Sequence, residues 1–361
     1  MKTAFFFRGK PATWIHYLNE LPVIRFGERY IGPHHPVVVI AEIGINHEGD
    51  SEACLKLVEM AAAAGVDAVK FQTLDVDENY VPGTESHAVF SKAQLTPEET
   101  AEAFRLARIL GMEALTTCGD IKTLEWVDKL KPAAHKISSG LVTHLPLIRA
   151  AAATKRPLII STGMCDILLA RKALEAAKTA GAAEVCLLQC TSIYPAPIDT
   201  LNLRSIRLLA EEFGVTVGFS DHSLGNEASG LAVAAGATVI EKHFSLDPSR
   251  PGFDHSLSVD LEGLKELVRT VRRAEVMLGN EEKTCSTEQE VAAQRYLRSI
   301  VARREIKSGE ILSLENVGFM RTLPEKRGLP PEAWDKMVGG KALRTIFKYQ
   351  TIQFDDISPQ T

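Results

Sequence analysis

The chain has 361 residues, of which 45% are hydrophobic and 24% are charged, and its formal net charge is −5. This length exceeds the size at which a single hydrophobic core usually stops growing, so we expect one large domain and one small one. Lys and Arg are interspersed with Asp and Glu, which excludes an extended basic surface for nucleic acid or an anionic membrane. Any anion-binding site must therefore be local.

The N-terminal region and the cysteines indicate the cellular compartment of the protein. The six cysteines include no CxxC pair and no dense framework of the kind found in small secreted proteins. We therefore expect reduced thiols and a cytoplasmic protein. The apolar run Phe5 to Phe7 is too short for a secretory signal or a membrane span. We expect residues 1–25 to be an N-terminal extension, without a predicted structure.

Between residues 26 and 280, short runs rich in Val and Ile alternate with longer Ala- and Leu-rich stretches of helical period. This alternation predicts βα units with eight strands, at residues 37–43, 68–72, 113–117, 134–137, 158–161, 185–190, 216–220 and 239–244. The helix Ser51–Ala64 is expected to begin after an N-cap at Asp50 or Ser51 and to end at Gly65. An open doubly wound sheet is the alternative, but eight consecutive units favour an α/β fold of the (β/α)8 TIM-barrel type.

A polar stretch follows the predicted helix Leu261–Leu278 and begins at Gly279 and Asn280. Its composition predicts a linker at residues 281–297. Residues 298–361 contain short β-like runs and turn signals such as Lys307-Ser308-Gly309, so we expect a small β-rich domain there.

Polar residues stand at the end of nearly every predicted barrel strand, where the active sites of such barrels lie. Lys70 and Lys136 end two of these strands, and small polar residues lie near them: Thr117, Ser139, Ser161, Gly163 and Ser220. One such lysine is more often a salt-bridge partner than a ligand contact, whereas two of them with neighbouring hydroxyls suit a compact anion carrying phosphate and carboxylate. Neither a P-loop nor a GxGxxG segment is found, so a nucleotide site is not expected.

His222 and His243 end the last two predicted strands and would therefore lie near each other at the barrel mouth. Two imidazoles with oxygen ligands suit a divalent cation, most of all Mn²⁺, with Mg²⁺, Co²⁺ or Zn²⁺ as alternatives. Each histidine alone is more often a hydrogen-bonded strand-end residue. Together with the anion-binding groups, the pair favours a metal site.

Several ordered segments resemble the sialic acid (N-acetylneuraminate) synthase family. They are AEIGINH at 41–47, KFQT at 70–73, KISSG at 136–140, STGM at 161–164, CTSIYP at 190–195, SDH at 220–222 and EKHF at 241–244. The resemblance covers residues 26 to 357 and includes a C-terminal part similar to the antifreeze-like (SAF) domain of those enzymes. It implies a TIM barrel that condenses phosphoenolpyruvate with an N-acylmannosamine or a related diacetamido sugar, uses a divalent metal and releases phosphate.

The resemblance also implies residue roles. Phosphoenolpyruvate would be held by Lys70, Thr117, Lys136, Ser139, Ser161, Gly163, Ser192 and Ser220, and the metal by His222 and His243. The amino sugar would face Glu42, Gln72, Tyr194 and Asp254, and Arg321 would reach the partner's active site in a domain-swapped homodimer. Many relatives have an acidic residue in place of Leu141 and an Asn in place of Thr84, which leaves the identity of the sugar open.

Three catalytic residues are expected, because acid–base work needs a carboxylate near both reactants and the anion needs two lysines: Glu42, Lys70 and Lys136. A Schiff-base aldolase that uses one of the lysines as its nucleophile is the first alternative. A carbohydrate-binding protein with a degenerate barrel is the second.

Overall fold

The computed structural model describes residues 20–280 and 282–358. The chain divides into two compact units, Met1–Asn280 and Glu281–Thr361. Most of the predicted N-terminal extension, residues 1–19, lies outside the described residues. No helix in the described parts is long and apolar enough to cross a bilayer.

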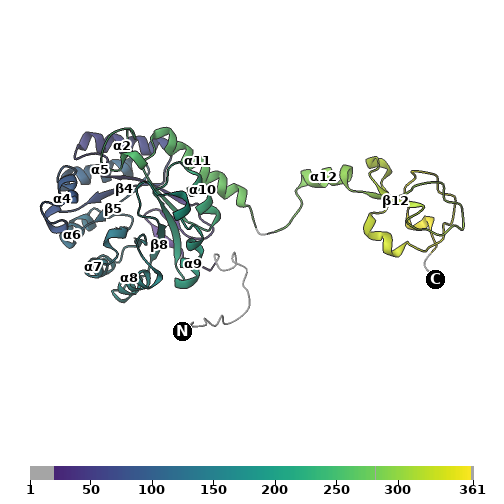
Figure 1. Cartoon of the computed structure of the whole chain (residues 1–361), viewed down its shortest axis with the longest axis horizontal. Helices are drawn as coiled ribbons and strands as arrows, with labels where there is room; N and C mark the ends of the chain where they lie inside the picture. Colours follow the sequence, from purple (N-terminus) through teal and green to yellow (C-terminus); the bar gives the residue numbers. More distant parts are fainter. Residues whose placement is uncertain (1–19, 281, 359–361) are drawn as a thin grey trace. The chain divides into compact units, whose positions relative to one another are not determined.

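Eight parallel strands close into a barrel in the order β10-β3-β4-β5-β6-β7-β8-β9, and helices surround it (Figure 1). The strands are β3 (Val38–Gly44), β4 (Ala68–Thr73), β5 (Glu113–Cys118), β6 (His135–Ile137), β7 (Leu158–Ser161), β8 (Val185–Cys190), β9 (Thr216–Asp221) and β10 (Val239–His243). The predicted (β/α)8 TIM barrel is confirmed, and every predicted strand boundary falls within one residue of the observed one.

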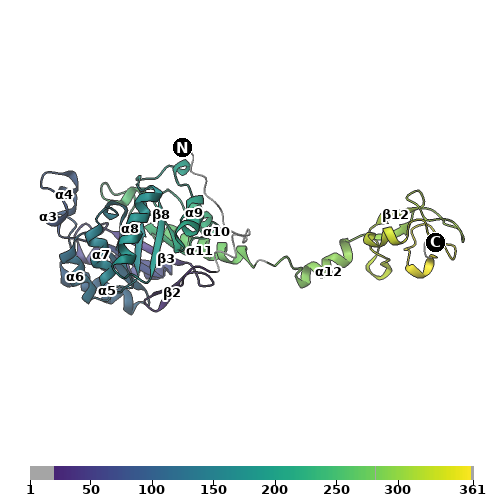
Figure 2. The same cartoon turned by 90° about the horizontal axis from the view of Figure 1, so that it is seen from below.

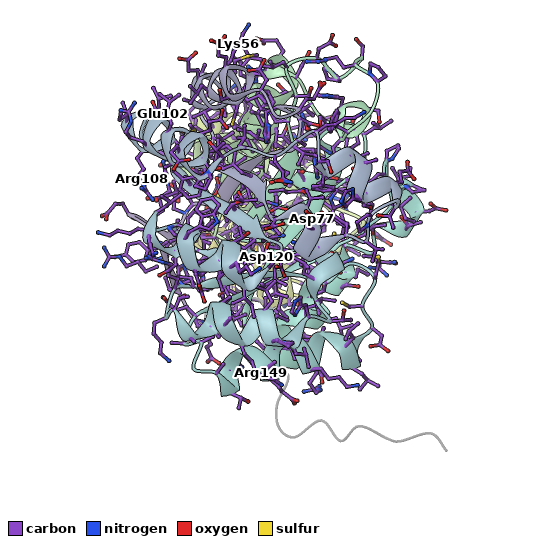
Figure 3. The ribbon with its side chains drawn as sticks, turned by 90° about the vertical axis from the view of Figure 1, so that its left-hand side faces the viewer. Lys56, Asp77, Glu102, Arg108, Asp120 and Arg149 are labelled. Atoms are coloured by element: carbon purple, nitrogen blue, oxygen red, sulfur yellow. The ribbon has the colours of Figure 1, made fainter. Side chains whose placement is uncertain are left out.

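The outer helices are α2 (Ser51–Ala64), α5 (Pro97–Ile109), α6 (Ile121–Lys129), α7 (Leu145–Ala153), α8 (Ile167–Thr179), α9 (Arg204–Phe213), α10 (Glu227–Ala234) and α11 (Leu261–Leu278). Helix α2 shows how local chemistry sets their ends. The Asp50 carboxylate accepts hydrogen bonds from the first-turn amides, and Gly65 ends the helix at φ 81°, as expected for these residue types. Exposed side chains such as Lys56 and Arg149 point outward from these helices (Figure 3).

A short antiparallel hairpin, β1 (Ile24–Phe26) and β2 (Arg29–Ile31), precedes the barrel. Its side chains Ile24, Phe26 and Ile31 pack in one buried cluster with Ile40 and Leu115 from the barrel interior. The hairpin therefore closes the N-terminal end of the barrel. Strand β1 spans the predicted boundary between residues 25 and 26.

An excursion after β4 carries α3 (Val76–Asn79) and α4 (Glu85–Phe90), and Figure 2 shows it at the end of the barrel away from β2. The Asp120 carboxylate ties it down by accepting hydrogen bonds from the Asp75 amide at 3.0 Å and Asn79 Nδ2 at 3.1 Å. Asp77 and Asp120 can be located in Figure 3. The excursion is thus anchored beside the carboxyl end of the barrel.

The second unit contains β11 (Ser299–Ala302) paired with β12 (Val317–Met320), and further isolated β-bridges. It has its own buried cluster, which includes Ile300, Leu312 and Ile346, and this confirms the small β-rich domain. Helix α12 (Thr287–Tyr296) occupies much of the predicted linker, and Ser286 and Gln289 form a capping box at its start. The polar composition hid this helix, because none of its residues is buried.

Short 3-10 helices complete the described structure: Ser139–Leu141, Ile198–Thr200, His255–Leu257, Pro324–Lys326, Pro331–Lys336 and Phe354–Asp356.

Candidate active site

The barrel interior has two layers, because alternate residues of a strand point to the same face. At the N-terminal end of the barrel, the inward positions are apolar, as at Ile40, Ile159 and Val239. Two residues further along the same strands, these positions become polar: Glu42, Ser161 and Glu241. The predicted polar strand ends therefore converge inside the carboxyl end of one barrel.

Lys70 and Lys136 lie in the polar layer and are 3% and 2% exposed. They come from β4 and β6, which are not neighbours, yet both ammonium groups approach Glu241 Oε1, at 3.5 Å for Lys70 and 3.6 Å for Lys136. Lys136 also donates to Ser161 Oγ at 2.7 Å. The two lysines predicted to bind one anion thus face one common space.

Glu241 is the central carboxylate of this cluster, and no role was expected for it from the sequence. Besides its two ion pairs, its Oε1 accepts a hydrogen bond from Ser220 Oγ at 3.0 Å, while its Oε2 is buried without a hydrogen-bond partner. The strand period contained the signal for this residue. Glu241 and His243 are two positions apart and must share a face, whereas Lys242 points the other way.

Lys242 belongs to the structure between the barrel and its helices. Its Nζ lies 3.0 Å from Asp221 Oδ2 and donates to the Ser223 carbonyl at 2.5 Å. Asp221 also accepts from the hydroxyl of Ser229 on α10. This ion pair is fully buried and is satisfied by protein groups alone.

Glu42 lies beside Lys70, with 2.8 Å between its Oε2 and the lysine Nζ, and its Oε1 accepts from Gln72 Nε2 at 3.1 Å. Burial raises the pKa of Glu42 to about 7, although Lys70 opposes this shift. Burial alone would also raise the pKa of Glu241. The positive charges of Lys136 and Lys70 prevail, however, and hold the pKa of that carboxyl below its usual range. The site therefore contains one carboxyl group that titrates near neutrality and one that stays ionised.

The pKa values of the two lysines also move in opposite directions. Burial favours the neutral amine of Lys70, but the carboxylates of Glu241 and Glu42 raise its pKa. For Lys136 burial prevails over the attraction of Glu241, and its pKa is lowered. Lys70 is therefore the more firmly charged of the two.

A second group of small polar side chains lies around Gly163. Ser139 Oγ accepts from the Gly163 amide at 3.0 Å and donates to Cys190 Sγ at 3.6 Å, and Ser192 Oγ lies 3.7 Å from the same sulfur. A Cβ atom at Gly163 would lie 2.2 Å from Ser192 Oγ. Cys190 had not been predicted here, although its inward position on β8 follows from the strand period.

His222 and His243 are brought together, with ring centroids 5.3 Å apart, and Tyr194 packs against both rings at 4.4 and 6.1 Å. His222 Nδ1 lies 3.0 Å from the Thr191 carbonyl, so this nitrogen carries the proton and Nε2 is left as the acceptor. His243 Nδ1 is buried without a hydrogen bond, and Asp254 Oδ2 is 3.5 Å away.

These groups fit a divalent cation. Burial, followed by the charge of His222, lowers the pKa of His243 well below its ordinary value, which favours the neutral ligand form. For His222, Cys190 raises the pKa against the effect of burial. Across residues 20–280 and 282–358, no group of three or more His, Cys, Asp or Glu side chains forms a complete metal site. A cation would therefore take further ligands from water or substrate.

Three further residues singled out in the sequence lie in different places. Thr117 is inside the barrel, opposite Lys136 in the strand register, and its hydroxyl has no hydrogen-bond partner. Thr84 caps α4 by accepting from the His87 amide, so its hydroxyl is already used by the excursion. Arg321 belongs to the second unit, where its guanidinium lies 5.1 Å from the centroid of the Tyr296 ring. Its predicted role in a partner's active site stays a prediction.

Comparisons with known proteins agree with this architecture. A model of the NeuB family matches residues 57–283, and one of the SAF domain matches residues 298–358. An uncharacterized protein of Methanocaldococcus jannaschii is 40% identical over 82% of this chain and 88% of its own length. The N,N'-diacetyllegionaminic acid synthase of Legionella pneumophila is 36% identical over 88% of this chain and 94% of its own length.

A solved structure extends the similarity to three dimensions. The N-acetylneuraminic acid (sialic acid) synthetase of Leptospira borgpetersenii serovar Hardjo-bovis, crystallised with citrate, has a TM-score of 0.72 and 28% identity, and covers 76% of this chain and 96% of its own. The family match spans more than half of the chain, and the Legionella and Leptospira relatives are synthases of sialic-type sugar acids. This chain therefore belongs to the NeuB family of nonulosonic acid synthases and is an enzyme.

Proposed function

We propose that this enzyme joins phosphoenolpyruvate to the aldehyde carbon of an N-acylated amino sugar and releases phosphate. The sugar would be N-acetylmannosamine or a 2,4-diacetamido-trideoxyhexose. The observation that carries the proposal is the placement of two buried ammonium groups, Lys70 and Lys136, in the same polar layer as the imidazoles of His222 and His243.

Phosphoenolpyruvate presents a phosphate and a carboxylate on a three-carbon unit, and the polar layer offers donors for both. Lys70 and Lys136 supply positive charge, and Thr117 supplies a hydroxyl without a partner of its own. The group around Gly163 adds the hydroxyls of Ser139 and Ser192. In the absence of substrate, Glu241 would keep the two ammonium groups together and reduce their mutual repulsion.

His222 and His243 would hold the metal, most of all Mn²⁺, with Mg²⁺, Co²⁺ or Zn²⁺ as alternatives. A bound cation would supply Lewis-acid polarisation of the sugar aldehyde. Gln72, Tyr194 and Asp254 would orient the amino sugar, since Tyr194 contacts both imidazole rings and Asp254 lies beside His243.

Glu42 would move the proton. Carbon 3 of phosphoenolpyruvate forms the new bond to the aldehyde carbon, and the aldehyde oxygen takes up one proton. Water then adds to carbon 2 and loses one proton to the Glu42 carboxylate, and the return of that proton to solvent balances the one taken up by the aldehyde oxygen. As the bond between carbon 2 and the phosphate oxygen breaks, the remaining hydroxyl on carbon 2 becomes the carbonyl of the product and its proton leaves with the phosphate. A carboxyl group whose pKa is about 7 suits a group that accepts and returns one proton near neutral pH.

Phosphate release measures this reaction directly. Purified protein, phosphoenolpyruvate and Mn²⁺ would be incubated with each candidate amino sugar, and each product would be identified by its mass. We expect release that needs both substrates and is abolished by EDTA. A carbohydrate-binding protein without activity would release no phosphate with any sugar.

A Schiff-base aldolase is the second candidate, and the lowered pKa of Lys136 favours it, because a buried neutral amine is a nucleophile. The two candidates respond differently to the same reagents. Activity that survives EDTA, together with a substrate adduct trapped on lysine by borohydride, would establish the aldolase and exclude the metal-dependent condensation.

We further propose that the enzyme acts as a domain-swapped homodimer in the cytoplasm, with Arg321 of each subunit serving the partner's barrel. The resemblance to the sialic acid synthases supports the dimer. The six free cysteines support a reducing compartment.

A further inference from the structure

Asp254 belongs to the segment that follows β10, and two unusual backbone conformations precede it. Gly252 has φ 83° and Phe253 has φ 48°. A left-handed conformation is costly for a residue such as Phe, so the surroundings must hold this segment in place. The carboxylate that lies 3.5 Å from His243 Nδ1 therefore depends on contacts made elsewhere.

Asn46 makes those contacts. Its Oδ1 accepts from the Asp254 amide at 3.1 Å, and its Nδ2 donates to the Phe244 carbonyl and to Ser258 Oγ, both at 2.9 Å. The Ser258 hydroxyl in turn donates to the Asp254 carbonyl at 2.6 Å. Both backbone polar groups of Asp254 are thus held, one by Asn46 itself and one through Ser258.

The side chain of Asn46 is buried and anchored, so it can hold Asp254 in one position. It is 2% exposed, and its backbone amide donates to the Ile43 carbonyl at the end of β3. The same strand carries Glu42, which pairs in register with His243 on β10. Asn46 therefore links the strand of the proposed acid–base group to the segment that presents Asp254.

A second tie joins the same two segments nearer the surface. Glu48 Oε1 lies 2.6 Å from the Arg250 guanidinium and 3.0 Å from His255 Nε2, and His255 Nδ1 lies 2.7 Å from Ser245 Oγ. Arg250 is 45% exposed at its side chain, so this tie is the weaker of the two. The buried amide of Asn46 is the dominant constraint.

We propose that Asn46 is a positioning residue that sets the Asp254 carboxylate for recognition of the amino sugar. This inference rests on the proposed function, in which Asp254 faces the sugar. Asn46 would not touch the substrate. Its amide would keep Asp254 at one distance from His243, and removing the amide would let the segment relax its left-handed residues.

Asn46→Ala tests the proposal through the Michaelis constants of the two substrates. We expect the sugar KM to rise about tenfold, because buried hydrogen bonds of this kind are worth a factor of that order, and the phosphoenolpyruvate KM to stay within about twofold. A general loss of structure would raise both constants together. Equal increases in the two KM values would therefore overturn the proposal.

Coupling to Asp254 gives the second readout. If Asn46 acts through Asp254, adding Asn46→Ala to an Asp254→Ala enzyme should leave the sugar KM where Asp254→Ala alone has put it. If the two substitutions instead multiply their effects on the sugar KM, Asn46 does not act through Asp254. Asn226→Ala is the matched control, because Asn226 Nδ2 also donates to a carbonyl, that of Gly263, which lies outside residues 250–258. It should change neither KM.

Hydrogen exchange tests whether Asn46 holds Asp254 in place, and it needs no substrate, metal or activity. The peptide covering residues 250–258 should exchange faster in Asn46→Ala than in the wild type, and at the wild-type rate in Asn226→Ala. If Asn46→Ala does not fold, Ser258→Ala takes its place, since it removes the contact to the Asp254 carbonyl and one acceptor of Asn46 Nδ2 but keeps the bond from the Asp254 amide to Asn46 Oδ1. An unchanged exchange rate in a folded variant would refute the role of Asn46 in holding Asp254. If the wild type releases no phosphate with any sugar, the proposed function fails, while exchange still decides whether Asn46 holds Asp254.

Discussion

Glu42 and Glu241 have the same functional group and lie against the same lysine, yet their pKa values move in opposite directions. Glu42 has one ammonium neighbour, and burial prevails over it. Glu241 has two, and together they prevail over burial. Neighbouring charge thus separates a carboxyl group that can exchange a proton near pH 7 from one that stays ionised, which is the usual basis for distinct roles in acid–base catalysis.

Glu42→Gln is expected to lower kcat by about 10²–10⁴, the range typical of a lost acid–base group. The pH dependence gives a second test. Glu42 must be ionised to accept the proton from water, so the wild-type rate should fall as pH drops through about 7, the pKa of this carboxyl. The Gln variant should lack that decline. Turnover equal to the wild type, or an unchanged acid limb, would remove Glu42 from the mechanism.

The turn between β7 and α8 shows how one glycine position shapes the anion site at the level of an element. Ser139, Cys190 and Ser192 approach Gly163 from two other strand ends, and a Cβ atom there would lie 2.7 Å from Ser139 Oγ. Close approach of several chain segments is a role that only glycine fills without displacement.

Gly163→Ala is therefore expected to raise the phosphoenolpyruvate KM by about 10- to 100-fold, since displacements of the order of 1 Å have effects of that size. Gly140→Ala is the matched control, because nothing lies within 4 Å of a Cβ at Gly140. Steady-state kinetics of both variants decide the matter. A Gly163→Ala enzyme with the wild-type KM would mean that this turn is not part of the anion site.

The N-terminal hairpin is tied to the barrel at Asp67, which lies before β4. Its carboxylate is 2.8 Å from Arg29 of β2 and 2.6 Å from Arg272 of α11, and it accepts from the Val39 amide at 2.9 Å. One side chain thus connects the hairpin, the first barrel strand and the last outer helix. It lies at the amino end of the strands, whereas catalysis belongs to the carboxyl end.

Asp67→Ala should lower the free energy of unfolding by about 1–3 kcal/mol, the cost of leaving buried donors without their acceptor, and thermal denaturation would measure the loss. Both arginines are about one third exposed, so solvent compensates part of the loss. The KM values should not change. Arg25→Ala is the control, because its ion pair with Glu28 is exposed. Equal stability losses in both variants would contradict this role of Asp67.

At the scale of the whole molecule, the question is whether each active site needs two chains. Arg321 lies in the second unit, beside Tyr296, and Glu42 lies in the first. If Arg321 serves the partner's barrel, a defect in each residue can be repaired by mixing subunits. A closed dimer with two-fold symmetry makes the expected outcome quantitative.

Arg321→Ala should raise the sugar KM more than the phosphoenolpyruvate KM, because the arginine is proposed to face the sugar. Mixing and reassembling this variant with Glu42→Gln should then restore about one quarter of the wild-type activity at low sugar, since half of the dimers are mixed and each has one intact site. If Arg321 acts within its own chain, no mixed dimer has an intact site and the mixture should gain nothing.

Local patterns were enough to predict the fold. The strand boundaries, the capped helix α2 and the small β-rich domain follow from hydrophobic period and from residues such as Asp50 and Gly65, whose effects extend over a few positions. The strand period also brings Lys70, Lys136, His222 and His243 to one end of one barrel. These features depend only on the order of residues along the chain.

Only the tertiary structure decided which of those polar groups meet, because closure of the barrel brings together strands far apart in sequence. It placed Glu241 between the two lysines, added Cys190 to the group around Gly163, and paired Lys242 with Asp221. It also showed that the hairpin β1–β2 closes the barrel and that α12 occupies the predicted linker. The pKa difference between Glu42 and Glu241 depends on burial and on distances across the barrel, and neither can be derived from residue order alone.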